Sequence, residues 1–434
     1  MVTFKKIIFA FVFLGLFQPL HAASKSGNFS TLTYNVAGLL ELFSSAPSSR
    51  QSATEQISCY VNQFDIVNVQ EDFNYHAALY DTCNNHNYRS PTSGGMGIGS
   101  GLNTMSYFEF SDIKRIQWED CSGVDCFTPK GFTMTKLRLE EGVFIDVYNL
   151  HTQAETNSAA LAARRENIKQ LLTYISSHSA GNAVIVMGDA NTRYTRAGDN
   201  MELFLDRGFK DVWIELLRAG ITPESGSNAL VCNPQVTSGS CEIVDKVLFK
   251  NSRYINLTPV TYEVRQDDEN RKGEKLSDHP PVVVDWRYET DSQIQWSDKY
   301  GGNGGTNFSD LDALATSNGI SKIALRAGRR VDQIQLTFNS GSVSTRGGSG
   351  GSLEVLELQS GEYLTSLEIC IGNKNGSDRV FYAAFKTNRE NRIEGGRKSN
   401  ECQTITAPQG WQIEGLHGSS GDEIDSLGAI FTKI

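Results

Sequence analysis

The sequence has no excess of basic residues and, beyond its N-terminal segment, no long hydrophobic run. Lys and Arg number 40 against 50 Asp and Glu, which gives a net charge of −10. This balance excludes a broad electrostatic attraction to nucleic acid, but not a local basic groove. Without a second apolar run we expect no integral membrane anchor. A hydrophobic content of 39% and a charged content of 21% exclude a disordered chain and predict a globular protein.

The apolar run at the N-terminus has the organisation of a secretory signal peptide. Lys5 and Lys6 precede the run Ile7–Phe17, and the small residue Ala22 follows it. This order of positive charge, apolar run and small residue predicts a signal peptide over residues 1–22. We therefore expect a secreted, extracellular protein.

Eight cysteines are present. In an exported chain they are expected to form disulfides, although spacing does not determine the connectivity. No histidine lies at a ligand-like spacing from them, which disfavours a structural zinc site. Proximity along the sequence favours the pairs Cys59–Cys83, Cys121–Cys126, Cys232–Cys241 and Cys370–Cys402.

The chain of 434 residues is too long for one ordinary core, and its composition changes once. Expected strands and helices alternate up to Tyr288. Glycines then gather in clusters, and no helical stripe of useful length follows. We expect an α/β domain over residues 28–288, a linker over 289–295 and an all-β domain over 296–434.

Chemically active side chains stand near the ends of the strands expected in the α/β domain. In Ala183–Tyr194 an apolar, β-branched run predicts a buried strand, with Asp189 and Asn191 on the turn after it. Residues two apart in an extended segment point the same way, which places a carboxylate beside an amide at a strand's carboxyl end. A strand followed by an Asx-stabilised turn explains this segment equally well.

The other expected strands are flanked by similar residues. Their ranges are 31–36, 65–71, 144–151, 243–249 and 282–286, with helices over 53–64 and 161–175. Each flanking residue alone has an ordinary explanation as a turn residue, a surface charge or a core histidine. Their joint occurrence in a compact strand–helix chain predicts one shared site. The residues are Asn35, Glu71, His151, Asp189, Asn191, Asp278 and His279.

The chain resembles the endonuclease/exonuclease/phosphatase superfamily over roughly residues 28–288. The resemblance implies a four-layered α/β sandwich, in which two mixed β-sheets lie face to face with helices outside. It also implies a metal-dependent phosphoric diester hydrolase. The matching pieces, in that family's order, are Tyr34-Asn35, Gln70-Glu71, Asn149–His151, Gly188–Asn191, Val244-Asp245 and Ser277–His279.

The resemblance also implies a metal site. Asn35 and Glu71 are its expected ligands, and Asp278 is expected to contribute to a second site. Hard oxygen donors suit Mg²⁺, with Mn²⁺ or Ca²⁺ as alternatives, and such an ion polarises a phosphoryl oxygen. Lys130 and Arg193 are weaker candidates for phosphate binding, since a solvated surface charge is an equally good explanation of each.

The catalytic roles follow from the same resemblance. His279 is expected to act near the attacking water and to be held by Asp245, which fixes its tautomer. His151 is expected to hydrogen-bond a phosphoryl oxygen. Asp189 and Asn191 are expected to orient the water and the phosphate.

Within the superfamily, segments 121–133 and Tyr148–Gln153 look most like secreted sphingomyelinase-type phosphodiesterases. Inositol-polyphosphate phosphatases share a Gly-Asp-x-Asn-x-Arg piece, matched through Arg193, but their Pro-Ala-Trp-Cys-Asp-Arg element is replaced here by Glu242–Lys246. Pancreatic-type deoxyribonucleases share the core, so a nucleic-acid phosphodiester stays open beside a phospholipid head group. Four aromatic residues fit either an apolar rim for a lipid head group or, as we favour, core strands. They are Tyr107, Phe108, Phe110 and Trp118.

The second domain resembles jacalin-type lectins over roughly Gln295–Ile434, which implies a three-sheet β-prism. Alternating strands such as Val331–Phe338 lie between its glycine clusters, and Ile424–Phe431 repeats the pattern. The lectin signature, a glycine followed four residues later by aspartate, is matched by Gly421–Asp425. The prism turn would keep these glycines for backbone reasons alone, so the signature supports the fold more directly than sugar binding.

The lectin resemblance implies a carbohydrate site at the turn that begins with Gly421. Asp425 is expected to accept hydrogen bonds from sugar hydroxyls. Backbone N–H groups of Asp422, Glu423 and the Gly301–Gly305 loop, which includes Gly302, are expected to complete the site.

Together these features predict a secreted, Mg²⁺-dependent, sphingomyelinase-like phosphodiesterase. Its lectin domain would hold it on cell-surface glycans and so raise the local substrate concentration. One alternative is a secreted deoxyribonuclease-like endonuclease. Another is a carbohydrate-binding protein with an inactive enzyme-like domain, against which the intact set of expected catalytic residues argues.

Overall fold

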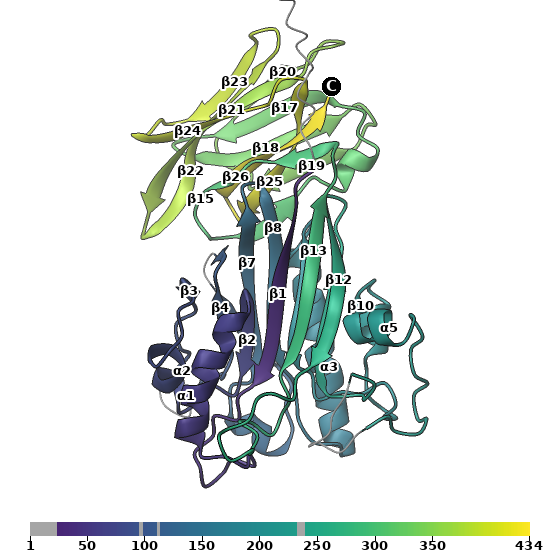
Figure 1. Cartoon of the computed structure of the whole chain (residues 1–434). Helices are drawn as coiled ribbons and strands as arrows, with labels where there is room; N and C mark the ends of the chain where they lie inside the picture. The colour runs from purple at the N-terminus through teal and green to yellow at the C-terminus, as the bar shows by residue number, and fades with distance from the viewer. Residues whose placement is uncertain (1–23, 95–98, 111–112, 232–238) are drawn as a thin grey trace, which may run out of the picture.

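A computed structural model describes residues 24–94, 99–110, 113–231 and 239–434. The expected signal peptide therefore lies outside the described residues, as does Cys232 with its expected pairing. Within the described ranges, no helix is long and apolar enough to cross a membrane. The chain forms an α/β sandwich followed by an all-β prism (Figure 1).

The first sheet of the sandwich has six strands, and β1 and β2 run parallel at its centre. The remaining neighbours are antiparallel, so the sheet is mixed, as expected. Its order is β12 (Ile255–Val264), β13 (Val282–Thr290), β1 (Ser26–Asn35), β2 (Ile66–Gln70), β4 (Asn103–Ser106) and β3 (Tyr88–Arg89).

The second sheet has seven strands and is also mixed, because β8 and β9 are parallel while their outer neighbours are antiparallel. Gly188 lies in β9 at a φ of 153°, and a Cβ there would stand 2.1 Å from the carbonyl oxygen of Leu150, so this close approach of β8 and β9 requires glycine. The order is β10 (Lys210–Asp211), β11 (Asp245–Lys250), β9 (Ala183–Asp189), β8 (Val143–His151), β7 (Gly131–Glu140) and β5 (Glu109–Phe110), with β6 (Lys114–Gln117) also on β7.

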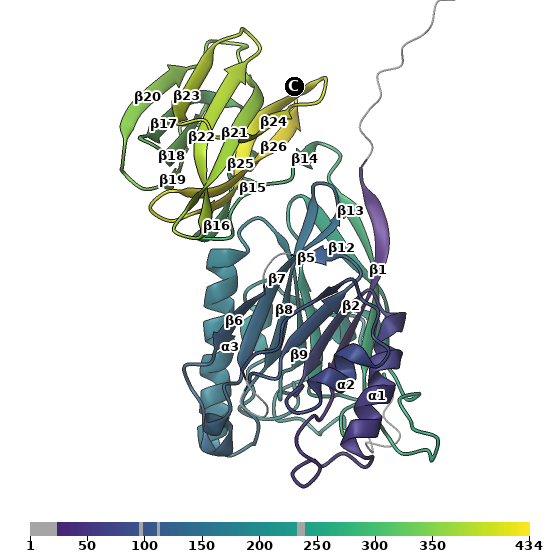
Figure 2. The ribbon, with the colours of Figure 1, turned by 90° about the vertical axis from the view of Figure 1, so that its left-hand side faces the viewer.

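Helices cover the outer faces of the two sheets, which confirms the four-layered sandwich (Figure 2). The longest helix, α3, begins after Asn157, whose side chain accepts hydrogen bonds from two backbone N–H groups of the first turn. Its buried stripe includes Ile168 and Leu171. The helices are α1 (Arg50–Tyr60), α2 (His76–Asp81), α3 (Ser158–His178), α4 (Glu202–Leu205) and α5 (Val212–Leu217), with short 3₁₀ turns η1 (Val61–Gln63) and η2 (Gly123–Phe127).

The favoured core placement of the four aromatic residues before Lys130 is confirmed in its main part. Trp118 is buried, and Phe108 and Phe110 are partly buried against the core. Tyr107 is half-buried and donates a hydrogen bond from its hydroxyl to the carbonyl oxygen of Asn62 at 3.0 Å. These side chains stabilise the sandwich.

The second domain consists of three groups of antiparallel strands, as the β-prism requires. Backbone pairing between the group that contains Trp411–Ser420 and the group that contains Leu364–Lys374 is limited to one residue pair, Ile413 with Leu364. One group contains β14 (Ile294–Trp296), β15 (Tyr300–Gly301), β16 (Thr306–Ser309), β25 (Trp411–Ser420) and β26 (Ile424–Lys433). The next contains β21 (Leu364–Lys374), β22 (Ser377–Thr387), β23 (Arg392–Gly396) and β24 (Glu401–Thr406). The third contains β17 (Ile320–Ala327), β18 (Val331–Phe338), β19 (Val343–Gly347) and β20 (Ser352–Glu357).

Two glycines show the internal repetition of the prism. Gly347 and Gly396 each end the outer strand of a hairpin at a φ of 92°. A Cβ at either position would lie 2.1 Å from a backbone carbonyl oxygen of the neighbouring strand, that of Asp332 or of Phe381. The same backbone requirement therefore recurs in two of the three strand groups.

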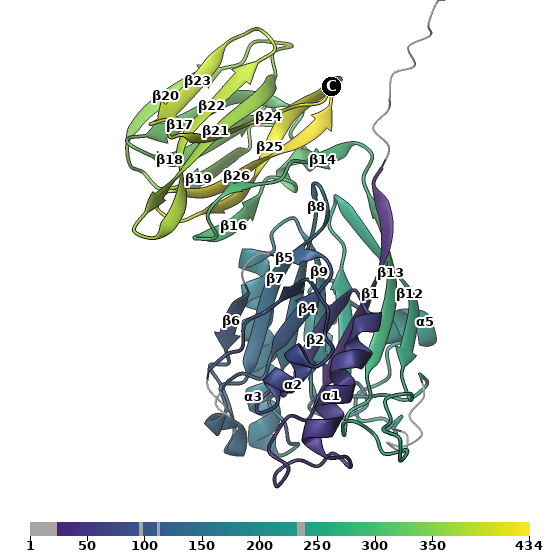
Figure 3. The ribbon, with the colours of Figure 1, turned by 60° about the vertical axis from the view of Figure 1, so that its left-hand side comes forward.

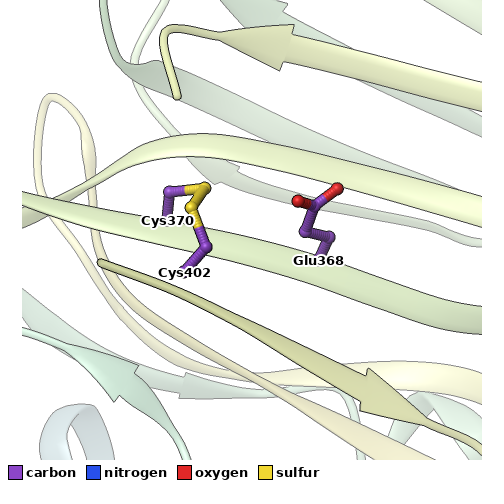
Figure 4. A group of neighbouring side chains, drawn as sticks. All are labelled: Glu368, Cys370 and Cys402. Carbon is purple, nitrogen blue, oxygen red and sulfur yellow. A yellow bond between two sulfur atoms is a disulfide. The ribbon is translucent and has the colours of Figure 1, made fainter. Parts of the chain in front are cut away.

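Three of the expected disulfides are present: Cys59–Cys83, Cys121–Cys126 and Cys370–Cys402. The last lies beside Glu368 on neighbouring strands of the prism (Figure 4). Although carboxylate and sulfur atoms are close there, both sulfurs are bonded to each other, so this group does not offer thiolate ligands to a metal.

The prism packs against one end of the sandwich (Figure 3). Arg138 pairs with Asp298 across the junction at 2.8 Å, and Asn307 donates to the carbonyl oxygen of His178 at 3.0 Å. Between the last sandwich strand and the first prism strand only residues 291–293 lie outside strands. Both β1 and β8 begin at the prism end and run to the opposite end of the sandwich.

Candidate active site and lectin site

The strand ends remote from the prism bring most of the expected site residues together. His151 ends β8 and pairs in register with Asp189 at the end of β9, while Asp245 begins β11 opposite Asp189. Asn35 ends β1 and Glu71 directly follows β2 in the facing sheet. The two sheets therefore contribute to one cluster.

Asn35 connects the two sheets through its side-chain amide. Its Nδ2 donates to Glu71 Oε1 at 3.1 Å and to Asp189 Oδ2 at 3.2 Å, and its Oδ1 accepts from the backbone N–H of Ala37 at 3.0 Å. In this orientation Asn35 presents its nitrogen, not its oxygen, to the carboxylates, so direct ligation of a metal by its oxygen requires the amide to turn.

His279 and Asp245 form the expected pair. His279 Nδ1 lies 2.9 Å from Asp245 Oδ2, and Nε2 on the other side of the ring lies 3.8 Å from Asp189 Oδ2. Burial alone would lower the pKa of His279, but the negative charges of Asp245 and Asp189 outweigh it and raise the pKa well above its usual value. Ser277, which the sequence reading gave no role, fixes this segment by donating to the carbonyl oxygen of Asn35 at 2.6 Å.

His151 has the opposite electrostatic character. Burial and then Lys130 lower its pKa to about 3, although Asp189 lies 3.4 Å from its Nε2. The ring is therefore neutral at physiological pH. Its Nδ1 is buried without a hydrogen-bond partner, while the indole N–H of Trp118 donates to its carbonyl oxygen at 2.7 Å.

The two carboxylates that face Asn35 differ in pKa. Burial raises the pKa of Glu71, only partly opposed by its hydrogen bond from Asn35. Burial acts in the same direction on Asp189, but His279 and His151 outweigh it and lower its pKa. Within the described ranges, neither carboxylate forms an ion pair with a lysine or arginine.

This donor set fits a divalent cation. Carboxylate oxygens of Glu71 and Asp189 converge on one amide, and no lysine or arginine of the described residues pairs with either of them. Hard oxygen donors are what such ions prefer. One donor atom from each of Asp189, Asp245 and His279 also lies within 4.8 Å of the others. The buried Oδ1 of Asp245 has no hydrogen-bond partner.

The remaining expected site residues are distributed around the cluster. Asp278 is exposed, accepts a hydrogen bond from the hydroxyl of Ser45, and raises the pKa of Glu71. Lys130 pairs with Asp125 at 2.9 Å and lowers the pKa of both Glu71 and His151. Lys130 thus acts electrostatically on the site.

Asn191 and Arg193 are placed differently from the expectation. The backbone of Asn191 is left-handed, with a φ of 47°, and its N–H donates to Asp189 Oδ1 at 3.0 Å. This is the Asx-stabilised turn, so the extended geometry assumed for Asp189 and Asn191 is wrong. Arg193 lines a separate cavity with Arg165 and Tyr194.

The turn at Asp425 has the backbone arrangement expected of a lectin site. The backbone N–H of Gly302 donates to the carbonyl oxygen of Asp425 at 2.9 Å. A Cβ on Gly304 or Gly305 would lie 2.6 or 2.4 Å from the Asp425 carboxylate, so the glycines let this loop approach it. The carboxylate itself is buried and forms an ion pair with Arg379.

The neighbouring acidic residue is also neutralised. Glu423 is held by Arg330 at 2.8 Å and by Lys374 at 2.8 Å, and these bonds lower its pKa to about 2. Arg379 could not be predicted from the sequence, because it lies on β22 of another strand group. The N–H of Gly421 donates to the carbonyl oxygen of Glu423 at 3.0 Å, which closes the turn around Asp422.

Comparison with known proteins agrees with the two architectures. Residues 40–242 match the family described as Endonuclease/Exonuclease/phosphatase family 2, and residues 297–430 match the Jacalin-like lectin domain. A sphingomyelinase of Mycobacterium bovis is 36% identical over 275 residues, which cover 62% of this chain and 54% of that protein.

The lectin half has relatives of its own. Jacalin-related lectin 9 of Arabidopsis thaliana is 29% identical over 143 residues, which cover 31% of this chain and 44% of that protein. The structure of Malaysian banana lectin is 25% identical, with a TM-score of 0.29, and covers 32% of this chain and 98% of that one. The chain thus spans about half the length of the curated relatives it matches.

Proposed function

Because the chain joins an endonuclease/exonuclease/phosphatase domain to a jacalin-like lectin domain, we propose that it is a secreted, divalent-metal-dependent phosphodiesterase that acts on a phospholipid head group and is held on glycans by its lectin domain. The observation that supports the reaction best is the convergence of Glu71 and Asp189 on Asn35, with His279 beside Asp189. The three disulfides fit an oxidising, extracellular compartment. We retain residues 28–288 and 296–434 as the proposed limits of the two domains.

The chain's own residues would divide the hydrolytic step between two histidines. Asp245 holds Nδ1 of His279 as a donor, so in the neutral form of the ring Nε2 would accept a proton from the attacking water as its oxygen bonds to phosphorus. Positive charge held by the neighbouring carboxylates would oppose the raised pKa of His279 and so favour this neutral form. His151, neutral and buried, would donate a hydrogen bond to a phosphoryl oxygen and stabilise the charge that grows there. The bond from phosphorus to the leaving oxygen would then break, and this oxygen would take up a proton from the protonated His279 or from water to leave as the alcohol. Asp189 and Asn191 would orient the water and the phosphate.

We propose that the ion is held by Glu71 and Asp189, and by Asn35 once its amide has turned. Asp278 is proposed to contribute to a second site. A bound Mg²⁺ supplies positive charge that offsets these carboxylates and the charge developing on the phosphoryl oxygens. Lys130, which acts electrostatically on Glu71 and His151, is the proposed phosphate-binding cation, whereas Arg193 lies on another cavity.

A phospholipid is favoured over DNA for two reasons. The M. bovis relative is a sphingomyelinase, and its similarity covers 62% of this chain. The net charge of −10 also opposes a broad contact with a nucleic-acid backbone. The protein would thus resemble a lipid phosphodiesterase in substrate as well as in fold.

The test is a substrate panel of sphingomyelin vesicles, plasmid DNA and an inositol polyphosphate, each with Mg²⁺ or EDTA. We expect Mg²⁺-dependent release of phosphocholine from sphingomyelin and none with EDTA. Cleavage of DNA but not of lipid would replace the substrate assignment with an endonuclease. Activity on none of the three would favour a carbohydrate-binding protein with an inactive enzyme-like domain.

A further inference from the structure

Two loops at the site end of the sandwich expose large apolar side chains to solvent. Leu42 and Phe43 are 86% and 69% exposed, and Val124 and Phe127 are 71% and 89% exposed. Across the part of the chain that the structure describes, these four are the most exposed of the large hydrophobic side chains. Exposed apolar groups that gather beside a functional site indicate a contact surface.

The first loop is fixed at its base and apolar at its tip. Backbone N–H groups of Phe43 and Ser44 both donate to the carbonyl oxygen of Leu40, at 2.7 and 3.1 Å, and so form a turn. The carboxylate of Glu41 is turned back to accept the backbone N–H of Arg50 at 2.9 Å. Leu42 and Phe43 are therefore held outward by a hydrogen-bonded turn whose one acidic group is engaged by the protein.

The second loop follows the same principle with a disulfide. Cys121–Cys126 closes the short η2 turn that bears Val124 and Phe127. Its one charged residue, Asp125, accepts the backbone N–H of Ala154 at 2.7 Å and pairs with Lys130 at 2.9 Å. The acidic group thus faces the protein while both apolar side chains face solvent.

Both loops are connected to the proposed site, one at Glu71 and the other beside the end of β8. The first is bound to Glu71 through the backbone N–H of Gly38, which donates to the Glu71 carbonyl oxygen at 2.9 Å. The second is bound to Ala154, just beyond His151 at the end of β8. Lys130 at its base also acts on the Glu71 carboxylate.

We propose that these two loops form a two-point anchor that inserts into the surface of a lipid bilayer and places the active site against it. The proposal rests on the proposed function, because a lipid substrate requires the site to face a membrane. A bilayer is favoured over a protein partner, since the tips are two small separate apolar points with inward-turned charges instead of one continuous surface with a polar rim. The aromatic rings of Phe43 and Phe127 suit the headgroup boundary.

The location of the prism is consistent with this orientation. It packs against the end of the sandwich opposite the site, so it does not cover either loop (Figure 2). Glycans held by the prism would then extend from the membrane alongside the sandwich. The lectin would increase residence near the membrane, and the loops would set the orientation of the site.

The test measures binding to glycan-free vesicles of phosphatidylcholine and sphingomyelin by co-sedimentation. The full chain would carry His279→Asn, so that no substrate is consumed, together with L42S/F43S, V124S/F127S or all four changes. V260S is the matched control, because Val260 is 57% exposed on β12. We expect each pair to weaken binding several-fold and the four changes to weaken it at least tenfold, with V260S unchanged.

A second measurement separates this proposal from the proposed function. With His279 intact, the four changes should slow hydrolysis of vesicular sphingomyelin at least tenfold and leave hydrolysis of soluble bis(p-nitrophenyl) phosphate unaltered. If the parent cleaves no lipid, the proposed substrate fails, while the sedimentation result still tests the anchor. Equal vesicle binding by parent and quadruple variant, or no binding by the parent, would overturn the anchor. Loss of a dimer on gel filtration in the quadruple variant would reassign the tips to self-association.

Discussion

The carboxylates at the end of the sandwich and those at the turn of the prism are neutralised in different ways. Glu71 and Asp189 face histidines and an asparagine, and within the described residues neither pairs with lysine or arginine. Asp425 is paired with Arg379, and Glu423 with Arg330 and Lys374.

The difference shows what each site lacks. In the sandwich cluster, no lysine or arginine of the described residues pairs with Glu71 or Asp189, so a divalent ion could bind there without breaking such a pair. The positive charge beside Asp189 is that of His279, whose pKa is raised. In the prism, a sugar hydroxyl that is to hydrogen-bond the Asp425 carboxylate must compete with an ion pair already formed by Arg379. The two sites therefore respond differently when a charged residue is removed.

The largest effect is expected from His279→Asn in the sandwich cluster. Loss of the proton acceptor held by Asp245 should lower kcat by about 10²–10⁴-fold. Circular dichroism should show an unchanged fold, because the ring is at the rim of the site and not in its core. His178→Asn, at the prism end of α3, is the matched control. A kcat within a few-fold of the parent would remove His279 from catalysis.

Two smaller effects, opposite to each other in sign, are expected on glycan binding by the prism. Asp425→Ala should weaken glycan binding about tenfold, because it removes the acceptor of the sugar hydroxyls. Arg379→Ala should strengthen binding, because it frees the same carboxylate. A glycan array followed by titration with the strongest ligand measures both. Equal affinity of the parent and Asp425→Ala would place the sugar elsewhere, and weaker binding by Arg379→Ala would make the guanidinium a sugar ligand.

A further prediction concerns stability at a buried histidine, His417, which has no carboxylate partner among the described residues. Burial, and then Lys299 and Lys136, lower the pKa of His417 to about 3, and its Nε2 lies 3.0 Å from the carbonyl oxygen of Ser297. In the unfolded chain its pKa is about 6.5, so the unfolded state binds the proton more readily. The free energy of unfolding should therefore fall as pH drops from about 6.5 towards 3, by up to about 1.4 kcal/mol per pH unit.

His417→Gln should reduce this acid dependence, and urea unfolding at several pH values measures it. His279 provides the comparison. Asp245 and Asp189 raise its pKa, so its titration should increase the free energy of unfolding towards acid pH, which is the opposite pH dependence. Identical pH slopes for the parent and His417→Gln would show that His417 does not titrate in this range.

Much of the sandwich site could be predicted from the sequence, because each contributing residue stands at the end of an apolar strand. Asn35, Glu71, His151 and Asp189 meet since parallel neighbours end at one edge of a sheet and the two sheets face each other. The geometry after β9 was not predictable, because an extended segment and an Asx turn have the same composition. The left-handed backbone of Asn191 shows that this segment forms the Asx turn.

Features that depend on packing between distant segments could not be predicted. Arg379 reaches Asp425 from another strand group, and no spacing rule connects them. The apolar residues Leu42 and Phe43 are visible in the sequence, but their exposure depends on how the turn at Leu40 and the hydrogen bond from Arg50 direct them. Apolar composition alone would have assigned them to the core.

We propose that a divalent ion held through Glu71 is required for lipid hydrolysis. This requirement is tested by phosphocholine release from sphingomyelin vesicles during a Mg²⁺ titration of EDTA-treated protein, with Glu71→Gln beside the half-buried control Glu55→Gln on α1. We expect saturable activation of the parent and of Glu55→Gln, and a rate for Glu71→Gln that is lower by about 10²-fold or more and unresponsive to Mg²⁺. An undiminished rate in EDTA, or normal activation of Glu71→Gln, would contradict the account.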